Sequence, residues 1–370
     1  MRFVGCVPFN EESNQIVHLL RMCWAYVFPG IYLPAGLFFS LVFDLHRLTP
    51  ADFLGVLQIS VNIIGGAVKV FGAFNLFTYL QETESILDKL DQRLESDFYC
   101  LKIHKAVAQC NAIFLIYGIC YFVYTIFMLL SGVIMSKPPW LVYNPFFDWR
   151  ESFGLLCAQI IFEYYLMFFM ATLLLIVDVF PVICVIIFRS HVDVLKCHIR
   201  TLRSDLLKTE AENYKELVAC ILDHKSILLC SNAVRSVISR SIFIQFLLIG
   251  IVLGLTLINV FYFSSLFRGI SLMIFVAAIL MQTFPFCYLC DLLVADCNDL
   301  PHLLFQSNWI DAEPKYKTTL RFFMFHLQQP IIFIAGDVFP VSVSSNIKVA
   351  KFAASVMAIV QRMNLADRFK

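Results

Sequence analysis

Long apolar runs alternate with polar segments along the whole chain, and each run approaches the ~20 residues that a helix needs to cross a bilayer. The pattern predicts an all-α polytopic membrane protein with seven transmembrane helices. The predicted spans cover residues 20–43, 53–80, 107–135, 153–188, 236–263, 270–297 and 338–362.

Three of the polar segments carry apolar residues at helical spacing, and all three lie on the same side of the membrane. The first two stripes consist of Leu195, Ile199, Leu202 and Leu206, and of Leu217, Ile221, His224 and Leu228. The third is segment 314–329, where Pro314 suits the first turn of a helix. These helices pack within one subunit or form a place where subunits meet, and the stripes leave both interpretations open.

The distribution of Lys and Arg predicts the orientation. The N-terminal segment and the segments after spans two, four and six carry 18 of these residues, and the opposite side carries 7. The positive-inside rule therefore predicts a cytoplasmic N-terminus and an extracellular C-terminus, the reverse of a G-protein-coupled receptor.

Composition excludes a soluble enzyme, because 60% of the residues are hydrophobic and only 15% are charged. A net charge of +1 gives no reason to expect a nucleic-acid partner. No catalytic triad, His-x-x-x-His pair or phosphate-binding glycine loop is present in the sequence. We expect no enzymatic activity, no catalytic residues, no cofactor and no metal.

Charged residues inside the spans are expensive, so they are usually paired or functional. Lys69 and Asp178 come to a similar depth on spans that run in opposite directions, which predicts a structural ion pair. Glu163 lies near mid-membrane, where either a ligand contact or a hydrogen-bonded structural role explains it. Gly65 and Gly66 are interpreted as positions of close helix packing.

The segment before the last span predicts a break in the helix. Gly336 permits unusual backbone dihedrals, and Pro340 removes a backbone donor. A hinge and a static turn both fit this pattern.

Several short motifs point to a known family. They are Gln329-Pro330-Ile331, Phe339-Pro340-Val341-Ser342, Lys351-Phe352-Ala353-Ala354-Ser355, Asn144-Pro145-Phe146-Phe147-Asp148-Trp149 and the intramembrane Asp178. With these motifs the chain resembles the insect odorant receptors, specifically their odour-tuning subunits. Two departures from related patterns are Val356, where this family often has Tyr, and Gln361-Arg362, where gustatory receptors carry Gln-Phe.

The resemblance implies a subunit of a ligand-gated, non-selective cation channel in the plasma membrane of a sensory neuron dendrite. It further implies an obligate co-receptor subunit in a heterotetramer, a small volatile organic ligand and surrounding membrane lipid. The implied organisation is 1–190 for the first four spans, 191–235 for a helical cytoplasmic anchor, 236–298 for spans five and six, 299–330 for a further anchor helix, and 331–370 for the hinge and a pore-lining helix.

The last helix carries the candidate pore residues on one face. They are Lys348, Phe352, Ser355, Ile359 and Met363, with Arg362 at the edge, and Gly336 and Pro340 form the candidate hinge. Ile359 and Met363 either form a hydrophobic gate or pack against neighbouring helices.

The ligand is expected in the outer half of the bundle, between spans two, three, four and six. The candidate contacts are Leu57, Ser60, Asn62, Ile64, Phe122, Tyr124, Phe127, Met128, Ser131, Gln159, Phe162, Glu163, Met167, Leu272, Met273 and Phe275. Alternative functions are a gustatory-type receptor channel, a transporter and a G-protein-coupled receptor.

Overall fold

A computed structural model describes residues 27–72, 76–92, 97–263 and 266–362 of the chain. Within this part, five helices are long and apolar enough to cross a membrane. They are α3 (Pro50–Gly72), α5 (Asp97–Met135), α6 (Phe153–Thr201), α7 (Glu210–Phe263) and α8 (Leu266–Phe305). These five correspond to the second to the sixth predicted spans, and they confirm the all-α membrane class.

The first and last predicted spans are less regular. The first contains a short π-helix (η1, Phe28–Tyr32) followed by α2 (Leu33–Phe43), and its residues 20–26 lie outside the described part. The last contains α10 (Val343–Arg362), which is less apolar because it includes Lys348 and Lys351. The count of seven spans and the orientation of the termini remain predictions.

The described helices extend beyond the predicted spans on this side of the second and third spans. The predicted second span contains α3 and the start of α4 (Leu76–Asp91), and segment 81–106 is largely helical where it is described, since it contains the rest of α4 and the start of α5. Hydropathy misses these helices because their charged residues lower the local average, although no glycine or proline interrupts them. A short 3₁₀ turn (η2, Leu45–Arg47) joins α2 to α3.

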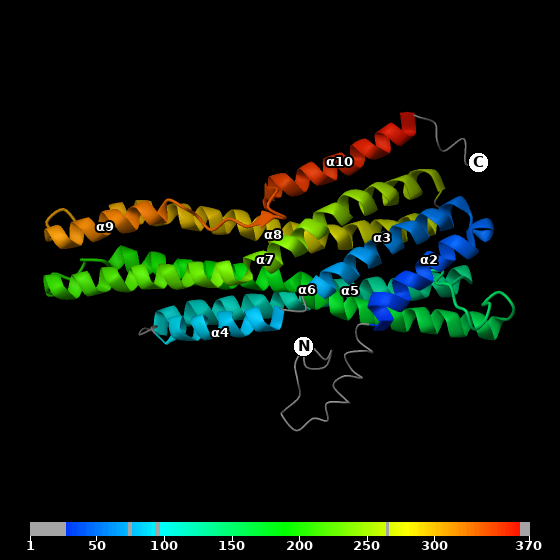
Figure 1. The fold of residues 1–370 in the computed structure, drawn as a ribbon, viewed down its shortest axis with the longest axis horizontal. Coiled ribbons are helices and arrows are strands. Elements are labelled where there is room, and N and C mark those ends of the chain that lie inside the picture. Colours follow the sequence, from blue (N-terminus) through cyan, green and yellow to red (C-terminus); the bar gives the residue numbers. More distant parts are fainter. Residues whose placement is uncertain (1–26, 73–75, 93–96, 264–265, 363–370) are drawn as a thin grey trace, which may run out of the picture.

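The helices α6, α7 and α8 are longer than the membrane is thick. At about 1.5 Å per residue, the 49 residues of α6 extend over about 74 Å, more than twice the ~30 Å hydrocarbon core. Their projecting parts and α9 (Pro314–Leu327) gather at one end of the molecule, and α2 and α3 lie at the other (Figure 1). We call the described residues within 191–235 and 299–330 the anchor end.

The anchor end confirms most of the predicted stripes. Leu195, Ile199 and Leu202 are buried, and α9 begins at Pro314 as predicted. Leu206 is a correction: α6 ends at Thr201, so Leu206 falls in the following turn with 98% of its side chain exposed.

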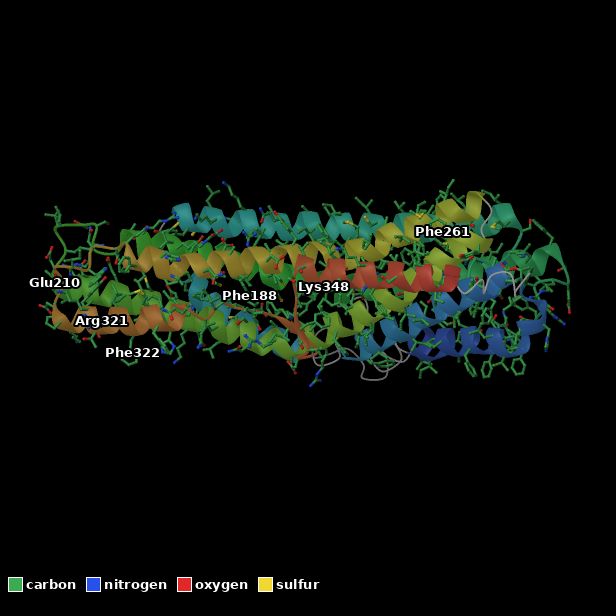
Figure 2. All side chains as sticks on the ribbon, turned by 90° about the horizontal axis from the view of Figure 1, so that it is seen from above. Phe188, Glu210, Phe261, Arg321, Phe322 and Lys348 are labelled. Carbon is green, nitrogen blue, oxygen red and sulfur yellow. The ribbon has the colours of Figure 1, made fainter. Side chains whose placement is uncertain are left out.

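The central helix of the bundle is α6. In its most apolar stretch 78% of the residues are buried by the protein itself, against 17% in α5. The outward face of α5 includes Leu115 and Ile119, which are more than 60% exposed in the isolated subunit. A lipid-facing role for α5 and a core role for α6 follow from this difference. Figure 2 shows Phe188 of α6 within the bundle, between the labelled anchor residues and Phe261.

A buried polar network joins five helices near the middle of the molecule. Lys69 of α3 forms the predicted ion pair with Asp178 of α6 and also donates to Gln245 of α7. Tyr121 of α5 donates to Asp178, and Gln282 of α8 donates to the Tyr121 hydroxyl at 2.8 Å and accepts from Gln245. The ion pair predicted from the sequence is thereby confirmed.

The glycines of α3 allow close helix contact, as predicted. A Cβ at Gly65 would lie 2.3 Å from the side chain of Leu248 on α7, and one at Gly66 would lie 2.9 Å from Met170 on α6.

The break between α9 and α10 is a small antiparallel pairing of β1 (Ile334–Ala335) with β2 (Phe339–Pro340). Gly336 has a φ of 55°, its amide donates to the Ser239 carbonyl at 3.2 Å, and a Cβ there would lie 2.6 Å from the Phe243 ring. The helix break is confirmed, and this turn is fixed against α7. A hinge role for Gly336 and Pro340 remains a prediction.

The buried ion pair makes a stability prediction. The substitution D178N leaves the Lys69 ammonium buried without a counter-charge, which costs about 3–5 kcal/mol in such pairs. We expect a clearly lower midpoint of thermal unfolding for the purified protein in detergent. The control D148N removes a partly exposed carboxylate and should cost below about 1 kcal/mol. Equal midpoints for the two variants would contradict the structural importance of the pair.

Candidate functional site

Two adjoining cavities lie between α3, α5, α6 and α8 in the half of the bundle away from the anchor end. The empty space in the two cavities, together with open solvent at their mouths, is about 750 Å³ for the outer and about 600 Å³ for the deeper one. The outer cavity reaches loop 136–152, and the deeper one reaches the polar network at Tyr121 and Gln282. They share four lining residues, which are Ile59, Tyr124, Trp140 and Phe275.

Loop 136–152 forms one wall of the outer cavity, and a carboxylate on α6 holds the backbone of this loop. Glu163 accepts hydrogen bonds from the amides of Trp140 at 2.7 Å and Val142 at 2.8 Å. Gln159, one turn earlier on α6, donates to Glu163 at 3.0 Å and to the Val142 carbonyl at 2.9 Å, and it accepts from Asn144 at 3.0 Å. Glu163 and Gln159 are fully buried, and this loop occupies their polar atoms.

Ion pairs connect the same loop to the elements at the cavity mouth. Lys137 lies 3.3 Å from the carboxylate of Asp52, which is in the first turn of α3 and also accepts from Thr49 at 2.7 Å. Arg47 binds Asp148 at 3.2 Å. Partial burial opposes ionisation of Asp148, but hydrogen bonds from Arg150 hold the pKa of its carboxyl below the usual value. The roof of the cavity is therefore attached to η2, α3 and α6.

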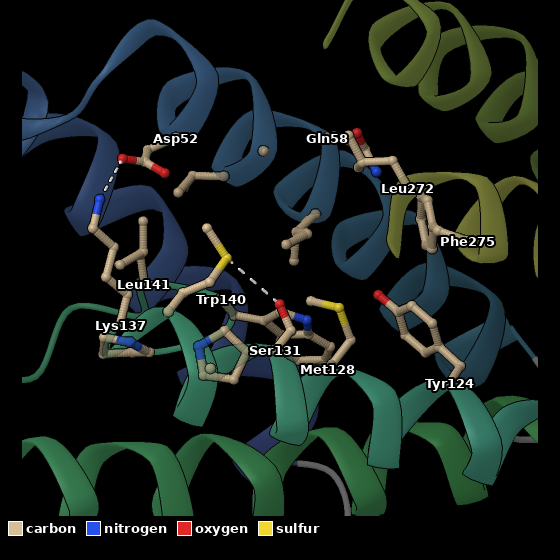
Figure 3. Close-up of a pocket in the computed structure, with 17 residues that line it drawn as sticks. Asp52, Gln58, Tyr124, Met128, Ser131, Lys137, Trp140, Leu141, Leu272 and Phe275 are labelled. Carbon is tan, nitrogen blue, oxygen red and sulfur yellow. Dashed lines mark hydrogen bonds and ion pairs between the residues drawn. The ribbon is translucent and has the colours of Figure 1, made fainter. Parts of the chain in front are cut away.

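The walls of both cavities are mainly aliphatic and aromatic. The Tyr124 ring lies 5.5 Å from the ring of Phe275, and Met167, Met170 and other apolar groups surround the deeper space. Figure 3 shows Tyr124, Met128 and Ser131 on α5, with Gln58, Leu272 and Phe275 across the outer cavity. An apolar cavity with a few polar groups suits a small organic molecule better than an ion or a polymer.

Comparison with known proteins identifies the family. The family model described as 7tm Odorant receptor matches residues 49–354. Odorant receptor 59b of Drosophila melanogaster is 48% identical over 370 residues, and the alignment covers all of this chain and 93% of that protein. The chain belongs to the insect odorant receptor family. Odorant receptor 42b of the same species is 44% identical with the same coverage of both chains.

The fold of this odorant receptor also matches a solved structure. The olfactory receptor OR5 from Machilis hrabei, in complex with eugenol, superposes with a TM-score of 0.81 over 96% of this chain and 93% of that one. Because the two sequences are only 15% identical, the match establishes the fold alone. As a family member with several membrane-spanning helices, the receptor is a multi-pass protein of the plasma membrane.

Seven of the predicted ligand contacts line the cavities of the receptor. Met128, Ser131 and Leu272 line the outer cavity, Asn62 and Met167 line the deeper one, and Tyr124 and Phe275 line both. Neither set of lining residues includes Leu57, Ser60, Ile64, Phe122, Phe127, Gln159, Phe162, Glu163 or Met273.

The remaining candidates have other neighbours for local reasons. Ile64 lies on the outer face of α3 and is 49% exposed, and the Ser60 hydroxyl bonds back to the Val56 carbonyl at 2.6 Å. Phe122 stacks on Phe168 with 5.1 Å between ring centroids, and Phe162 packs edge-on against Tyr32.

Sequence reasoning missed several cavity residues that carry polar groups, among them Gln58, Trp140 and Gln282. A signal existed for Gln58, because it precedes the candidate Asn62 by one helical turn and so shares its face. Nothing comparable existed for Trp140, whose position depends on how loop 136–152 folds over the bundle.

The candidate pore residues other than Met363 lie on α10, which contacts α7 and α8. Lys348 and Ser355 are exposed in the isolated subunit, as is Phe352 at 63%. The side chains of Ile359 and Arg362, and the whole of Met363, lie outside the described residues.

The base of α10 is tied to α8 beside the deeper cavity. Asn346 donates to the Thr283 hydroxyl at 2.9 Å, and Thr283 follows Gln282, which lines the deeper cavity. Asp291, farther along α8, accepts from the Val343 amide at 2.9 Å.

The attachment of the loop to Glu163 gives a testable prediction. The substitution E163A leaves two buried backbone amides without an acceptor, at about 1–3 kcal/mol each. Hydrogen exchange of the Trp140 and Val142 amides should accelerate at least about tenfold, the factor that 1.4 kcal/mol produces. E151A removes an exposed carboxylate of the same loop and should leave both rates unchanged. Unaltered exchange in E163A would show that other contacts hold the loop.

Proposed function

We propose that this receptor is the odour-tuning subunit of a ligand-gated, non-selective cation channel, and that a small volatile binds in the paired cavities. The observation that carries the proposal is the cavity pair itself: an apolar space with few polar groups, bounded by four helices and a loop. The fold neighbour solved with eugenol adds a related protein that holds a small aromatic molecule.

The proposed pore is lined by α10 of each subunit. Lys348, Phe352 and Ser355 give one face of this helix a mixed charged, aromatic and hydroxyl character, and the described part of the subunit leaves that face uncovered. Such a face is costly in contact with lipid, which favours contact with water or with other subunits. The proposed gate is formed by Ile359 and Met363 farther along the same segment.

The proposed partner is an obligate co-receptor subunit in a heterotetramer. At the anchor end, Phe322 and Phe325 of α9 are 69% and 62% exposed, although this end extends beyond the apolar part of the membrane. Figure 2 shows Phe322 at the edge of this end, beside Arg321. Lipid is not available to cover aromatic side chains there, so a neighbouring subunit is the favoured cover.

Cells that produce both subunits test the ligand site. The substitution A278F places a ring in the deeper cavity, so volatile-evoked current should fall at least about tenfold at a fixed dose, the effect of losing 1.4 kcal/mol of binding. A277F adds the same ring at the exposed neighbouring position and should keep the response. Surface labelling checks that equal amounts reach the membrane. Equal currents from both variants would argue against this cavity, and no current from the unmodified receptor over a broad volatile panel would argue against a channel.

The assembly surface is tested separately by co-purification. F322S/F325S removes the exposed aromatic pair of α9 and should reduce recovery of the tagged co-receptor. L206S/L207S changes two leucines of the same end that are more than 90% exposed in a turn, and should leave recovery unchanged. If the α9 variant co-purifies normally, α9 is not the subunit contact.

A further inference from the structure

The exposed face of α10 carries a row of polar side chains that includes two lysines. Asn346 and Ala353, on the opposite face of this helix, are buried against the rest of the subunit. The row is exposed in the isolated subunit, and its members follow one another at spacings of four, three and four residues, which places them on one line along a helix. They are Ser344, Lys348, Lys351 and Ser355.

Neither lysine has a counter-charge in the described part of the subunit. No described carboxylate lies within ion-pair distance of Lys348 or Lys351. Residues 343–362, which form α10, include no Asp and no Glu. Asp291 of α8 lies beside the start of α10, but it accepts from the backbone amide of Val343 at 2.9 Å. Two positive charges therefore point away from the subunit without compensation.

These charges lie at the level of the buried polar network. Asn346 donates to Thr283 at 2.9 Å, and Thr283 follows Gln282, which belongs to that network. At about 1.5 Å per residue, Lys348 lies about 3 Å and Lys351 about 7.5 Å farther along the helix axis than Asn346. Figure 2 shows Lys348 near the middle of the long axis of the molecule. A charged side chain at this depth is costly in contact with lipid, so water is the favoured surrounding.

Fixed positive charges beside a water-filled path act differently on different cations. The repulsion between an ammonium group and a permeating ion is proportional to the charge of the ion, so a divalent cation experiences twice the repulsion of a monovalent one. At a separation of about 8 Å and the dielectric constant of water, this difference lowers the relative occupancy of a divalent ion about twofold for each lysine. Two lysines in one row add their effects.

We propose that Lys348 and Lys351 make the pore that this subunit helps to form discriminate against divalent cations, so that Na⁺ permeates more readily relative to Ca²⁺ than it would without them. This inference rests on the proposed function, because it assigns ion selectivity to the proposed pore helix. The effect depends on charge and position alone, so arginine at the two positions serves equally well.

Reversal potentials test the inference in cells that produce this subunit and its co-receptor. The current is evoked by a volatile that activates the unmodified receptor, first in external Na⁺ and then in external Ca²⁺. In K348Q/K351Q the permeability ratio of Ca²⁺ to Na⁺ should rise at least about threefold, because two repelling charges are lost. K348R/K351R keeps both charges and should keep the ratio. K215Q/K225Q removes two exposed lysines of α7 at the anchor end and should also keep it.

A second measurement restores the charge on receptors that are already assembled. K351C should raise the permeability ratio of Ca²⁺ to Na⁺. External 2-aminoethyl methanethiosulfonate then attaches an ammonium group to the new thiol through a disulfide and should lower the ratio again in the same cells. Methyl methanethiosulfonate attaches a neutral group and should leave the ratio raised. The unmodified receptor, treated with both reagents, controls for the cysteines that it already contains.

The outcomes separate the inference from the proposed function. A volatile-evoked current with the same permeability ratio in K348Q/K351Q and in the unmodified receptor overturns the inference and leaves the channel proposal intact. The same ratio together with reduced co-purification of the co-receptor assigns the lysines to a contact between subunits, which also overturns it. If K348Q/K351Q does not reach the cell surface, the response of K351C to the two reagents decides. No current from the unmodified receptor over the volatile panel contradicts both proposals.

Discussion

The ion pair of Lys69 and Asp178 fixes the arrangement on which the rest of the receptor depends. Inside an apolar bundle, an ammonium and a carboxylate are tolerated only in contact with each other and with further hydrogen-bonding groups. Tyr121, Gln245 and Gln282 provide those groups from three other helices, so all five helices must keep one relative register. Tyr121 and Gln282, two members of this network, line the deeper cavity. The extent of that cavity therefore depends on the polar contacts of the network as well as on side-chain packing.

The deeper cavity and helix α10 also meet close to this network. Gln282 lines the deeper cavity, and the next residue, Thr283, accepts from Asn346 at the base of α10. One rigid helix, α8, thus carries the cavity wall and the attachment of α10 on adjacent residues. The turn before α10 is fixed separately, since Gly336 packs against Phe243 of α7.

The parts of the receptor that sequence predicts well are those where one strong physical cost dominates. Apolar length located the five long spans, and the cost of unpaired charges predicted the contact of Lys69 with Asp178. Hydropathy failed for α4 and the start of α5, where charged residues conceal a helix. Hydropathy also could not assign a role to Glu163. The backbone amides that donate to this carboxylate belong to a loop about 20 residues earlier, and the path of a loop produces no periodic pattern in the sequence.

The contacts that hold loop 136–152 in place are made mainly by its backbone, whereas side chains border the cavity. Glu163 and Gln159 contact mainly main-chain atoms of the loop, and every amino acid except proline offers the same amide there. Side chains at positions such as Met135 or Leu141 border the outer cavity without taking part in this attachment. Under the proposed function, substitutions at such positions alter the surface that the ligand meets and leave the fold of the roof intact. A receptor that binds its ligand in this cavity can then acquire a new odour preference through single amino-acid changes during evolution, with little loss of stability.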